Sequence, residues 1–274
     1  MKKTKILRLR RTGVLHIRGG LGNQLFQLSA LSYYSKYLKF QPIIYDFDLT
    51  LSQRDRYFPQ YQNFNFKNFF DASCPPIIMT KFQGFLFRQF LKLPIQGLIL
   101  DIQDMDDLLV NGKKPPYFFI LRGSFEEDRF PLEIGAFEIS RALSTNVQLP
   151  TKELSEVAIH IRVSGYGELS VSERRALYRV SERLIYLGHK RIDIYSDDVP
   201  TLVGKVPLKE GLIANWPEEH SQLSPPELLR ALARYNILVS NGSSISRWAN
   251  YLASASKNQI FINIKKFDTS EMPF

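Results

Sequence analysis

Residues 15–30 read LHIRGGLGNQLFQLSA, and this junction between an apolar stretch and a helical pattern decides how the chain begins to fold. Glycine in regular structure costs about 0.5–1 kcal/mol relative to alanine, so glycines placed here require a physical reason. One reason is a tight turn between strand and helix that needs a positive φ. The other is the close approach of a phosphate to backbone amides at a helix N-terminus. Either reason predicts a strand, a glycine loop and a helix in that order.

The pattern around this stretch predicts a strand–helix–strand unit at the start of the chain. Residues 14–19 are rich in β-formers, residues 23–40 carry apolar side chains at helical spacing, and residues 42–46 form a short apolar strand. Residues 50–116 are rich in Phe, Tyr, Gln and Pro, which predicts irregular or short helical structure. A further strand is predicted over residues 117–125.

A second alternating series begins near residue 157. It has Ser224 as the expected N-cap of one helix, a proline in that helix's first turn, and Gly188 closing another helix. The predicted elements are strand 157–163, helix 170–188, strand 191–198, helix 224–235, strand 236–241, helix 244–256 and strand 259–264. Strands that alternate with helices indicate parallel sheets. Because the series starts twice, we predict an α/β protein with two Rossmann-like domains facing a cleft, residues 1–148 and 149–274.

The composition is that of a soluble globular protein. The chain has 274 residues, of which 44% are hydrophobic and 23% charged, and no window offers enough uninterrupted apolar residues for a spanning helix. The basic opening MKKTKILRLRR is not followed by an apolar signal segment, so secretion is not expected. The single cysteine, Cys74, has no internal disulfide partner and no metal-ligand spacing around it, which favours a reducing compartment.

The formal net charge of +9 favours anionic partners. Nucleic acid, an anionic membrane surface and a phosphorylated small substrate all fit this balance, and an ordinary solubilising surface is the alternative. The basic residues concentrate in MKKTKILRLRR, LFRQFLKL and NIKKF. No zinc-finger spacing, RNP-like aromatic motif or GXXG loop of the KH type is present, so we do not expect a nucleic-acid partner.

Polar or glycine-rich segments follow four of the predicted strands. They are residues 18–24 (RGGLGNQ), 160–168 (HIRVSGYGE), 195–198 (YSDD) and 240–246 (SNGSSIS). In open α/β sheets, ligands bind beyond the carboxyl ends of the strands. The four segments therefore predict one nucleotide-lined site.

The first segment is an incomplete dinucleotide fingerprint. Gly20 and Gly22 give G-x-G, but Leu25 occupies the third glycine position. The adjacent amides of Asn23 and Gln24 favour donation to phosphate or sugar hydroxyls over a dehydrogenase role. A plain structural turn is the alternative interpretation.

The second segment places His160 and Arg162 two residues apart on a strand, so both side chains are expected on one face. A buried arginine needs an anion, and a diphosphate accepts its forked donors well. Pairing with a carboxylate from a neighbouring strand is the alternative.

The last two segments supply acceptors and donors. Asp197 and Asp198 can accept from a guanine edge or ribose hydroxyls, bind a metal, or simply cap a turn. Residues 240–246 supply hydroxyls and backbone amides at the start of a helix, which is an arrangement that binds anions.

These segments resemble glycosyltransferase family 11, the alpha-1,2-fucosyltransferases. GGLGNQLFQLSA is similar to that family's signature G-G-L-G-N-Q-[ML]-F-Q-Y-A, and HIRVSGY occupies the place of its H-x-R-R-G-D-Y motif. YSDD resembles F-S-D-D, SNGSSISRWANYL resembles S-N-S-[ST]-F-S-W-W-x-A-x-L, and LRGSFEEDRF is similar to G-Y-F-Q-S-x-x-Y-F. The matches come in family order and span nearly the whole chain.

The resemblance implies a GT-B-like fold and a metal-independent, inverting transfer of fucose from GDP-fucose, of the galactoside 2-alpha-L-fucosyltransferase type. The implied catalytic residues are His160, Arg162 and Glu168, with Glu168 as the base that deprotonates the acceptor hydroxyl; a surface glutamate is the alternative for that residue. The implied donor-binding residues are Gly20, Gly22, Asn23, Gln24, Tyr166, Asp197, Asp198, Asn241, Ser243, Ser244, Ser246 and Arg247.

The chain departs from the family pattern at the donor site. Val163 stands in place of the motif's second arginine, Ser164 in place of its glycine, and Gly165 in place of its aspartate. Arg247 replaces one tryptophan, and Gly242 is an extra residue before the serines. One hypothesis is that Arg247 restores the missing positive charge.

The expected partners are a nucleotide-sugar donor and an oligosaccharide or lipid-linked glycan of surface polysaccharide or O-antigen, with no cofactor and no metal. The expected location is cytoplasmic, with peripheral contact to an anionic inner membrane face. Three alternatives stay open: transfer from another GDP or UDP sugar, a non-catalytic nucleotide- or glycan-binding relative, and an NAD-dependent dehydrogenase.

Overall fold

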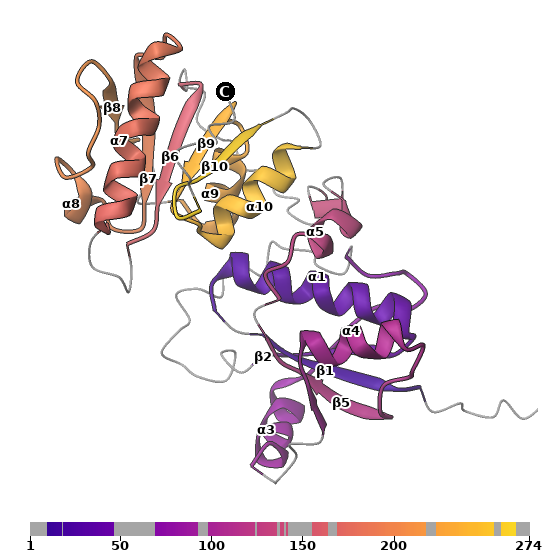
Figure 1. The fold of residues 1–274 in the computed structure, drawn as a ribbon. Coiled ribbons are helices and arrows are strands. Elements are labelled where there is room, and N and C mark those ends of the chain that lie inside the picture. Colours follow the sequence, from indigo (N-terminus) through magenta and orange to yellow (C-terminus); the bar gives the residue numbers. More distant parts are fainter. Residues whose placement is uncertain are drawn as a thin grey trace, which may run out of the picture. The chain divides into compact units, whose positions relative to one another are not determined.

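The computed structural model describes residues 10–17, 19–46, 69–92, 98–123, 125–135, 138–139, 141, 155–163, 169–217, 223–254 and 259–266, except for the side chains of Asp46 and Lys81. The chain divides into two compact units, Met1–Ser144 and Thr145–Phe274. Each unit contains one five-stranded sheet in which the paired strands run parallel (Figure 1). Two parallel-sheet units surrounded by helices confirm the predicted α/β class.

The first unit is built around the strand and helix that flank the glycine loop. Its sheet has the order β3-β2-β1-β5-β4, so β1 lies in the centre. The elements are β1 (Thr12–Ile17), α1 (Leu21–Leu38), β2 (Gln41–Asp46), β3 (Ile77–Ile78), α3 (Lys81–Phe90), β4 (Ile99–Leu100), α4 (Ile102–Val110), β5 (Phe118–Leu121) and α5 (Arg129–Ile134).

Helices cover both faces of this first sheet. On one face, Val14 and Ile120 pack with Phe87 of α3. On the other face, a Cβ added to Gly13 would lie 2.5 Å from the ring of Phe119, so this glycine is required by packing. Figure 1 shows α1 and α4 on the side of the sheet opposite α3. The double coverage explains why its strands read as apolar runs.

The second unit has β6 at its centre. Its sheet has the order β10-β9-β6-β7-β8. The elements are β6 (Val157–Ile161), α7 (Val171–Tyr186), β7 (Arg191–Ser196), α8 (Val199–Leu202), β8 (Ile213–Asn215), α9 (Pro225–Leu232), β9 (Ile237–Ser240), α10 (Ser244–Ala253) and β10 (Ile260–Asn263).

Alternate residues of β6 face two separate cores. Ile159 and Val239 pack with Leu177 of α7. Ala158 packs on the opposite face, with Ala249 of α10. Figure 1 shows α7 and the pair α9 and α10 on opposite sides of the sheet. Burial on both faces fixes the register of the central strand, and therefore fixes which residues follow its carboxyl end.

Local sequence signals set several helix boundaries. The predicted N-cap Ser224 and the proline in the first turn of α9 are confirmed, and Gly188 follows α7 with a φ of 90°. Reciprocal capping boxes begin four helices. They pair Thr80 with Gln83, Asp101 with Asp104, Ser170 with Glu173, and Ser224 with Glu227.

The structure adds elements that the sequence pattern did not predict. The strands β3, β4 and β8 have only two or three residues each, which is too short to display a period. The helix α8 has four residues. The helices α3 and α4 fit the expectation of short helices between residues 50 and 116. Within the ranges described above, no helix is both long enough and apolar enough to cross a membrane.

Candidate functional site

The order of strands in the second unit reverses between β6 and β9, and ligands of open α/β sheets bind outside the carboxyl ends at such a point. Arg162 follows β6 and Asn241 follows β9. The Asn241 side chain accepts from the Arg162 amide at 3.1 Å and donates to the Arg162 carbonyl at 2.9 Å. The two strand ends are therefore held together by one side-chain amide.

A third strand end joins this pair through Asp197, which follows β7. One carboxylate oxygen of Asp197 accepts from the amide of Val163 at 2.8 Å, and the other lies 3.9 Å from Nε of Arg162. The expectation that Arg162 is buried is wrong, because β6 ends at Ile161 and 45% of the arginine side chain is exposed. An exposed pair at this separation contributes at most about 1 kcal/mol. The carboxylate alternative for Arg162 is therefore present only as a weak contact.

His160 lies beneath the strand ends, not on the surface of the site. Its Nδ1 is 2.6 Å from Oγ of Ser246, and 3% of the histidine and none of the serine is exposed. This contact ties the central strand to α10. The pair therefore fixes the start of α10 relative to β6.

The predicted anion-binding segment forms the turn between β9 and α10. The amides of Gly242 and Ser243 donate to Oγ of Ser240 at 3.2 and 3.3 Å. Ser243 is the N-cap of α10 but makes no side-chain capping hydrogen bond, and Ser244 is 6% exposed. The segment thus places a helix N-terminus directly beside Asn241.

The second aspartate of the acidic pair has a structural role. Asp198 is the N-cap of α8, and its two carboxylate oxygens accept from the amide of Thr201 at 3.2 Å and from its hydroxyl at 2.6 Å. This is the capping alternative for that residue. Its neighbour Asp197 is the one that reaches the end of β6.

A cavity of about 360 Å³ opens at the same strand ends. It is lined by Arg162, Val163, Leu169, Ser170, Ser172, Glu173, Asn241 and Lys265. Arg162 and Asn241 were predicted for the site, whereas Lys265 and the residues that begin α7 were not. Two signals were available: the S-x-x-E spacing of a capping box, and the strand-end rule applied to the last predicted strand.

The other residues that were predicted for the site fall into three groups. Tyr166 and Glu168 lie outside the described residues, as do Ser164 and Gly165. Arg247, on α10, is not among the described residues that line the cavity. The glycine-loop residues belong to the first unit.

The glycine loop of the first unit has the predicted turn. Gly19 has a φ of 81°, and Gly20 is the extended N-cap of α1. The Gln24 side chain donates to the Gly19 carbonyl at 2.5 Å, and the Gln24 amide donates to the Gly20 carbonyl at 3.1 Å. A Cβ on Gly19 would lie 3.1 Å from the side-chain nitrogen Nδ2 of Asn23. Gly22 is buried inside the helix. Gln24 therefore organises the loop backbone, and no side-chain hydrogen bond caps α1.

The strand order of the first unit reverses between β1 and β5, beside this loop. Arg122 directly follows β5. Its Nε is buried, with no hydrogen-bond partner in the part of the chain that the structure describes. Arg122 was not predicted for the site, although the strand-end rule points to it.

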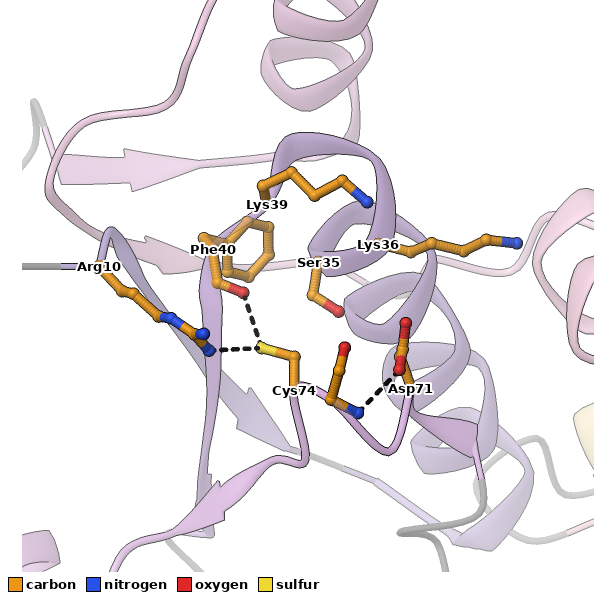
Figure 2. A pocket seen from close by; sticks show the side chains of 8 residues that line it. Arg10, Ser35, Lys36, Lys39, Phe40, Asp71 and Cys74 are labelled. Carbon is orange, nitrogen blue, oxygen red and sulfur yellow. Dashed lines mark hydrogen bonds between the residues drawn. The ribbon is translucent and has the colours of Figure 1, made fainter. Parts of the chain in front are cut away.

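A second pocket, of about 250 Å³, lies at the other end of α1 (Figure 2). Its lining includes Arg10, Lys36 and Lys39, and its thiol, Cys74, donates to the Phe40 carbonyl at 3.5 Å. Arg10 Nη1 lies 4.0 Å from that sulfur. Figure 2 shows Arg10 reaching the thiol, whereas Lys36 and Lys39 both come from the end of α1. Because the glycine loop begins α1 and this pocket surrounds its end, the two are separate places in the fold.

The pocket of Figure 2 also contains an acidic turn. The Ser73 amide donates to Asp71 at 2.8 Å, and this bond holds the pKa of the Asp71 carboxyl below its usual range. Among the residues described, no three His, Cys, Asp or Glu side chains gather as metal ligands would.

Solved structures of fucosyltransferases share this fold. The fucosyltransferase NodZ from Bradyrhizobium is 15% identical with a TM-score of 0.56, and the match covers 89% of this chain and 93% of that one. NodZ alpha-1,6-fucosyltransferase co-crystallised with GDP is 14% identical, with a TM-score of 0.53 and coverage of 89% and 92%. A mutant of Arabidopsis thaliana FUT1 in complex with GDP is 12% identical, with a TM-score of 0.51 and coverage of 89% and 69%. No family model and no curated protein matches the sequence.

Proposed function

We propose that this chain is a glycosyltransferase that moves fucose from GDP-fucose to a hydroxyl of a glycan. The observation that carries the proposal is the cavity at the β6–β9 reversal, which Arg162 and Asn241 line; Asn241 directly precedes the turn that begins α10. A cation beside helix amides is an arrangement that binds a diphosphate. The shared fold supports the same reading, because NodZ has been solved with GDP and with GDP-fucose.

The proposed chemistry is a displacement at the anomeric carbon of fucose. The acceptor oxygen attacks that carbon, the bond from the carbon to the β-phosphate oxygen breaks, and negative charge builds up on the departing GDP. Arg162 and the start of α10 would stabilise this charge, so the reaction is proposed to proceed without a metal ion. Glu168 is the proposed acceptor of the hydroxyl proton, and inversion follows from a single displacement.

Buried His160 enters this proposal as a positioning residue. Its bond to Ser246 sets where α10 begins, and the amides at that helix start would face the diphosphate. Asp197 is proposed to orient Arg162, with which it makes its 3.9 Å contact. The remaining donor-binding roles, including those of Gly20, Gln24 and the serines of α10, are likewise proposed from the sequence motifs.

The linkage and acceptor are finer proposals that rest on the sequence motifs. An alpha-1,2 linkage to an oligosaccharide or lipid-linked surface glycan is the reading we favour. The fold does not carry this choice, since NodZ is described as an alpha-1,6 enzyme. Transfer of a different sugar from GDP or UDP remains the second candidate, motivated by Val163 in the cavity wall.

Peripheral membrane contact has one structural support, an apolar outer face on α3. Phe82, Phe85 and Leu86 share one side of this helix and are 69%, 56% and 51% exposed. Arg88 and Lys92 are exposed beside them. Apolar side chains flanked by cations are the composition of a helix that lies on an anionic lipid surface.

The test of the donor proposal is calorimetric titration of the protein with GDP, GDP-fucose, UDP and NAD, each with and without EDTA. We expect micromolar GDP binding that survives EDTA, and about tenfold weaker binding in Arg162→Ala. Arg191→Ala is the matched control, because it removes an exposed arginine at the opposite end of a neighbouring strand. Binding of UDP alone would favour the second candidate, and an unchanged Arg162→Ala variant would remove that residue from the site.

The membrane proposal is tested by sedimentation with vesicles of anionic phospholipid and of neutral phospholipid. We expect binding to the anionic vesicles only, lost in Phe85→Ser. The control is Val110→Ser, which changes an equally apolar side chain that is 86% exposed at the end of α4. Equal binding by both variants would contradict the assignment to α3.

A further inference from the structure

Gly242, the extra residue before the serines, makes room for the segment that follows the last strand. Its φ is 85°, a conformation that other residues rarely adopt. A Cβ at this position would lie 3.3 Å from Oδ1 of Asn263 and 3.6 Å from Cδ of Lys265. The aliphatic stem of Lys265 therefore lies against the backbone of the turn between β9 and α10.

The backbone at Lys265 is held by two hydrogen bonds, its own and that of the preceding residue. The Lys265 amide donates to Oδ1 of Asn263 at 3.1 Å, and the preceding amide of Ile264 donates to the Ser240 carbonyl at 2.8 Å. Ile264 is buried with 3% exposure. The backbone of Lys265 is thus fixed beside β9, and its side-chain stem passes over Gly242.

Lys265 lines the same cavity as Arg162, and these are the two cations among its described lining residues. The carboxylate in that lining, Glu173, accepts from the Ser170 amide at 2.8 Å and from its hydroxyl at 2.7 Å. It is therefore engaged in starting α7. Asp197 approaches Arg162 only at 3.9 Å, and two cations on the wall of one cavity favour the binding of an anion there.

We propose that Lys265 is the second phosphate-binding cation of this site and that it and Arg162 contact a nucleoside diphosphate from two sides. The inference rests on the proposed function and names a residue for it. It assigns to Lys265 the charge that the sequence hypothesis gave to Arg247. Gly242 leaves room for the aliphatic stem of Lys265, and that stem places the ammonium group at the cavity.

The experiment compares Lys265→Met with Lys266→Met in calorimetric titrations with GDP, inorganic pyrophosphate and guanosine. Methionine keeps a long stem against Gly242 and removes the charge. Lys266 is also exposed, follows directly in the chain and does not line the cavity, so it is the matched control. Lys265→Arg keeps the charge and serves as the rescue variant.

We expect Lys265→Met to bind GDP and pyrophosphate about tenfold more weakly, with a smaller dependence on salt, while guanosine binding is unchanged. Lys266→Met and Lys265→Arg should behave like the unsubstituted protein. If Lys265→Met and Lys266→Met bind GDP equally, the inference is overturned and the donor proposal stands. If pyrophosphate binds through Lys265 but GDP does not bind, the donor proposal falls and the phosphate site stands. Absence of binding to either compound overturns both.

Discussion

The side chain of Asn241 pairs with the backbone of Arg162 as a neighbouring strand would, donating to its carbonyl at 2.9 Å and accepting from its amide at 3.1 Å. The ladder between β6 and β9 ends where His160 pairs with Ser240. Asn241 thus adds one more pair of hydrogen bonds beyond the sheet. The position of Arg162 in the cavity is set by this amide.

The first prediction concerns this amide. Asn241→Asp keeps an acceptor for the Arg162 amide but places a carboxylate oxygen against the Arg162 carbonyl, so the free energy of unfolding should fall by about 1–3 kcal/mol. Thermal unfolding measures the loss. Asn111→Asp is the control, because its side chain makes an exposed bond at the end of α4. Equal losses in the two variants would contradict the role given to Asn241.

The second prediction separates the fold from the ligand at the glycine loop. Gly20 has a φ of −73° and no atom within 4 Å of an added Cβ, so Gly20→Ala should leave the unfolding temperature unchanged. Its affinity for GDP should nevertheless fall, because the methyl group would block the approach of a phosphate. Gly13→Ala should instead unfold the protein at lower temperature, since its Cβ meets Phe119 at 2.5 Å. Normal GDP binding by Gly20→Ala would remove the loop from the donor site.

The third prediction concerns a buried carboxylate in the second unit. Asp193 is 2% exposed and accepts from Tyr235 at 3.0 Å, from Ser155 at 3.0 Å and from Asn215 at 2.5 Å. Asp193→Asn leaves buried donors without an acceptor and should lower the free energy of unfolding by about 3 kcal/mol. Tyr235→Phe removes one of these donors together with the hydroxyl that lies 2.7 Å from that of Tyr195, and it should cost less, about 2 kcal/mol. Denaturant unfolding followed by circular dichroism ranks the two, and the reverse order would contradict this account.

The fourth prediction tests the room made by Gly242. Gly242→Ala combines an unfavourable φ of 85° with contact to Asn263 and Lys265, whereas Gly204→Ala has a φ of 74° and an empty surrounding. Both variants should be destabilised by about 1 kcal/mol through backbone strain. Gly242→Ala should lose more, and it should also bind pyrophosphate more weakly. Equal thermal stabilities would show that the stem of Lys265 does not need this glycine.

The fifth prediction is a pKa in the first unit. The Lys36 ammonium and the Tyr37 hydroxyl both donate to Glu133, and chiefly the lysine holds the pKa of that carboxyl below its usual range. Since the folded pKa is the lower one, the carboxylate stabilises the fold above the unfolded pKa, and this is lost as the pH falls through the folded pKa. A carboxyl NMR titration of Glu133 should show a low midpoint that rises in Lys36→Gln. An unchanged midpoint in that variant would contradict the ion pair.

Strands and helices with strong periodicity were predictable from the sequence. The central strand before Arg162 and the helix that starts after Ser224 lie where the apolar pattern and capping residues placed them. The strands β3 and β4 could not be predicted, because two residues have no period and pair only when a neighbouring strand is already present. Their contribution is visible only in the finished sheet.

The candidate site was predictable in its residue types but not in its burial. The strand-end rule selected Arg162 and Asn241, which do meet. The exposure of Arg162 depends on β6 ending two residues earlier than the predicted strand 157–163, and that is set by sheet pairing. The strand-end rule could have selected Lys265, which follows the last predicted strand, but its contact with the β9–α10 turn depends on the backbone angle of Gly242, far away in the sequence.

One wall of the cavity is already rigid before any ligand arrives. The hydroxyl of Ser170 and the carboxylate of Glu173 satisfy each other's backbone amides at the start of α7, and Oγ of Ser172 lies 3.0 Å from Oγ of Ser170. These side chains therefore have little rotamer freedom to lose when a ligand binds. The entropic cost of recognition falls instead on the half-exposed side chain of Arg162 and on the end of Lys265 beyond its contact with Gly242, so these two groups set the temperature dependence of binding.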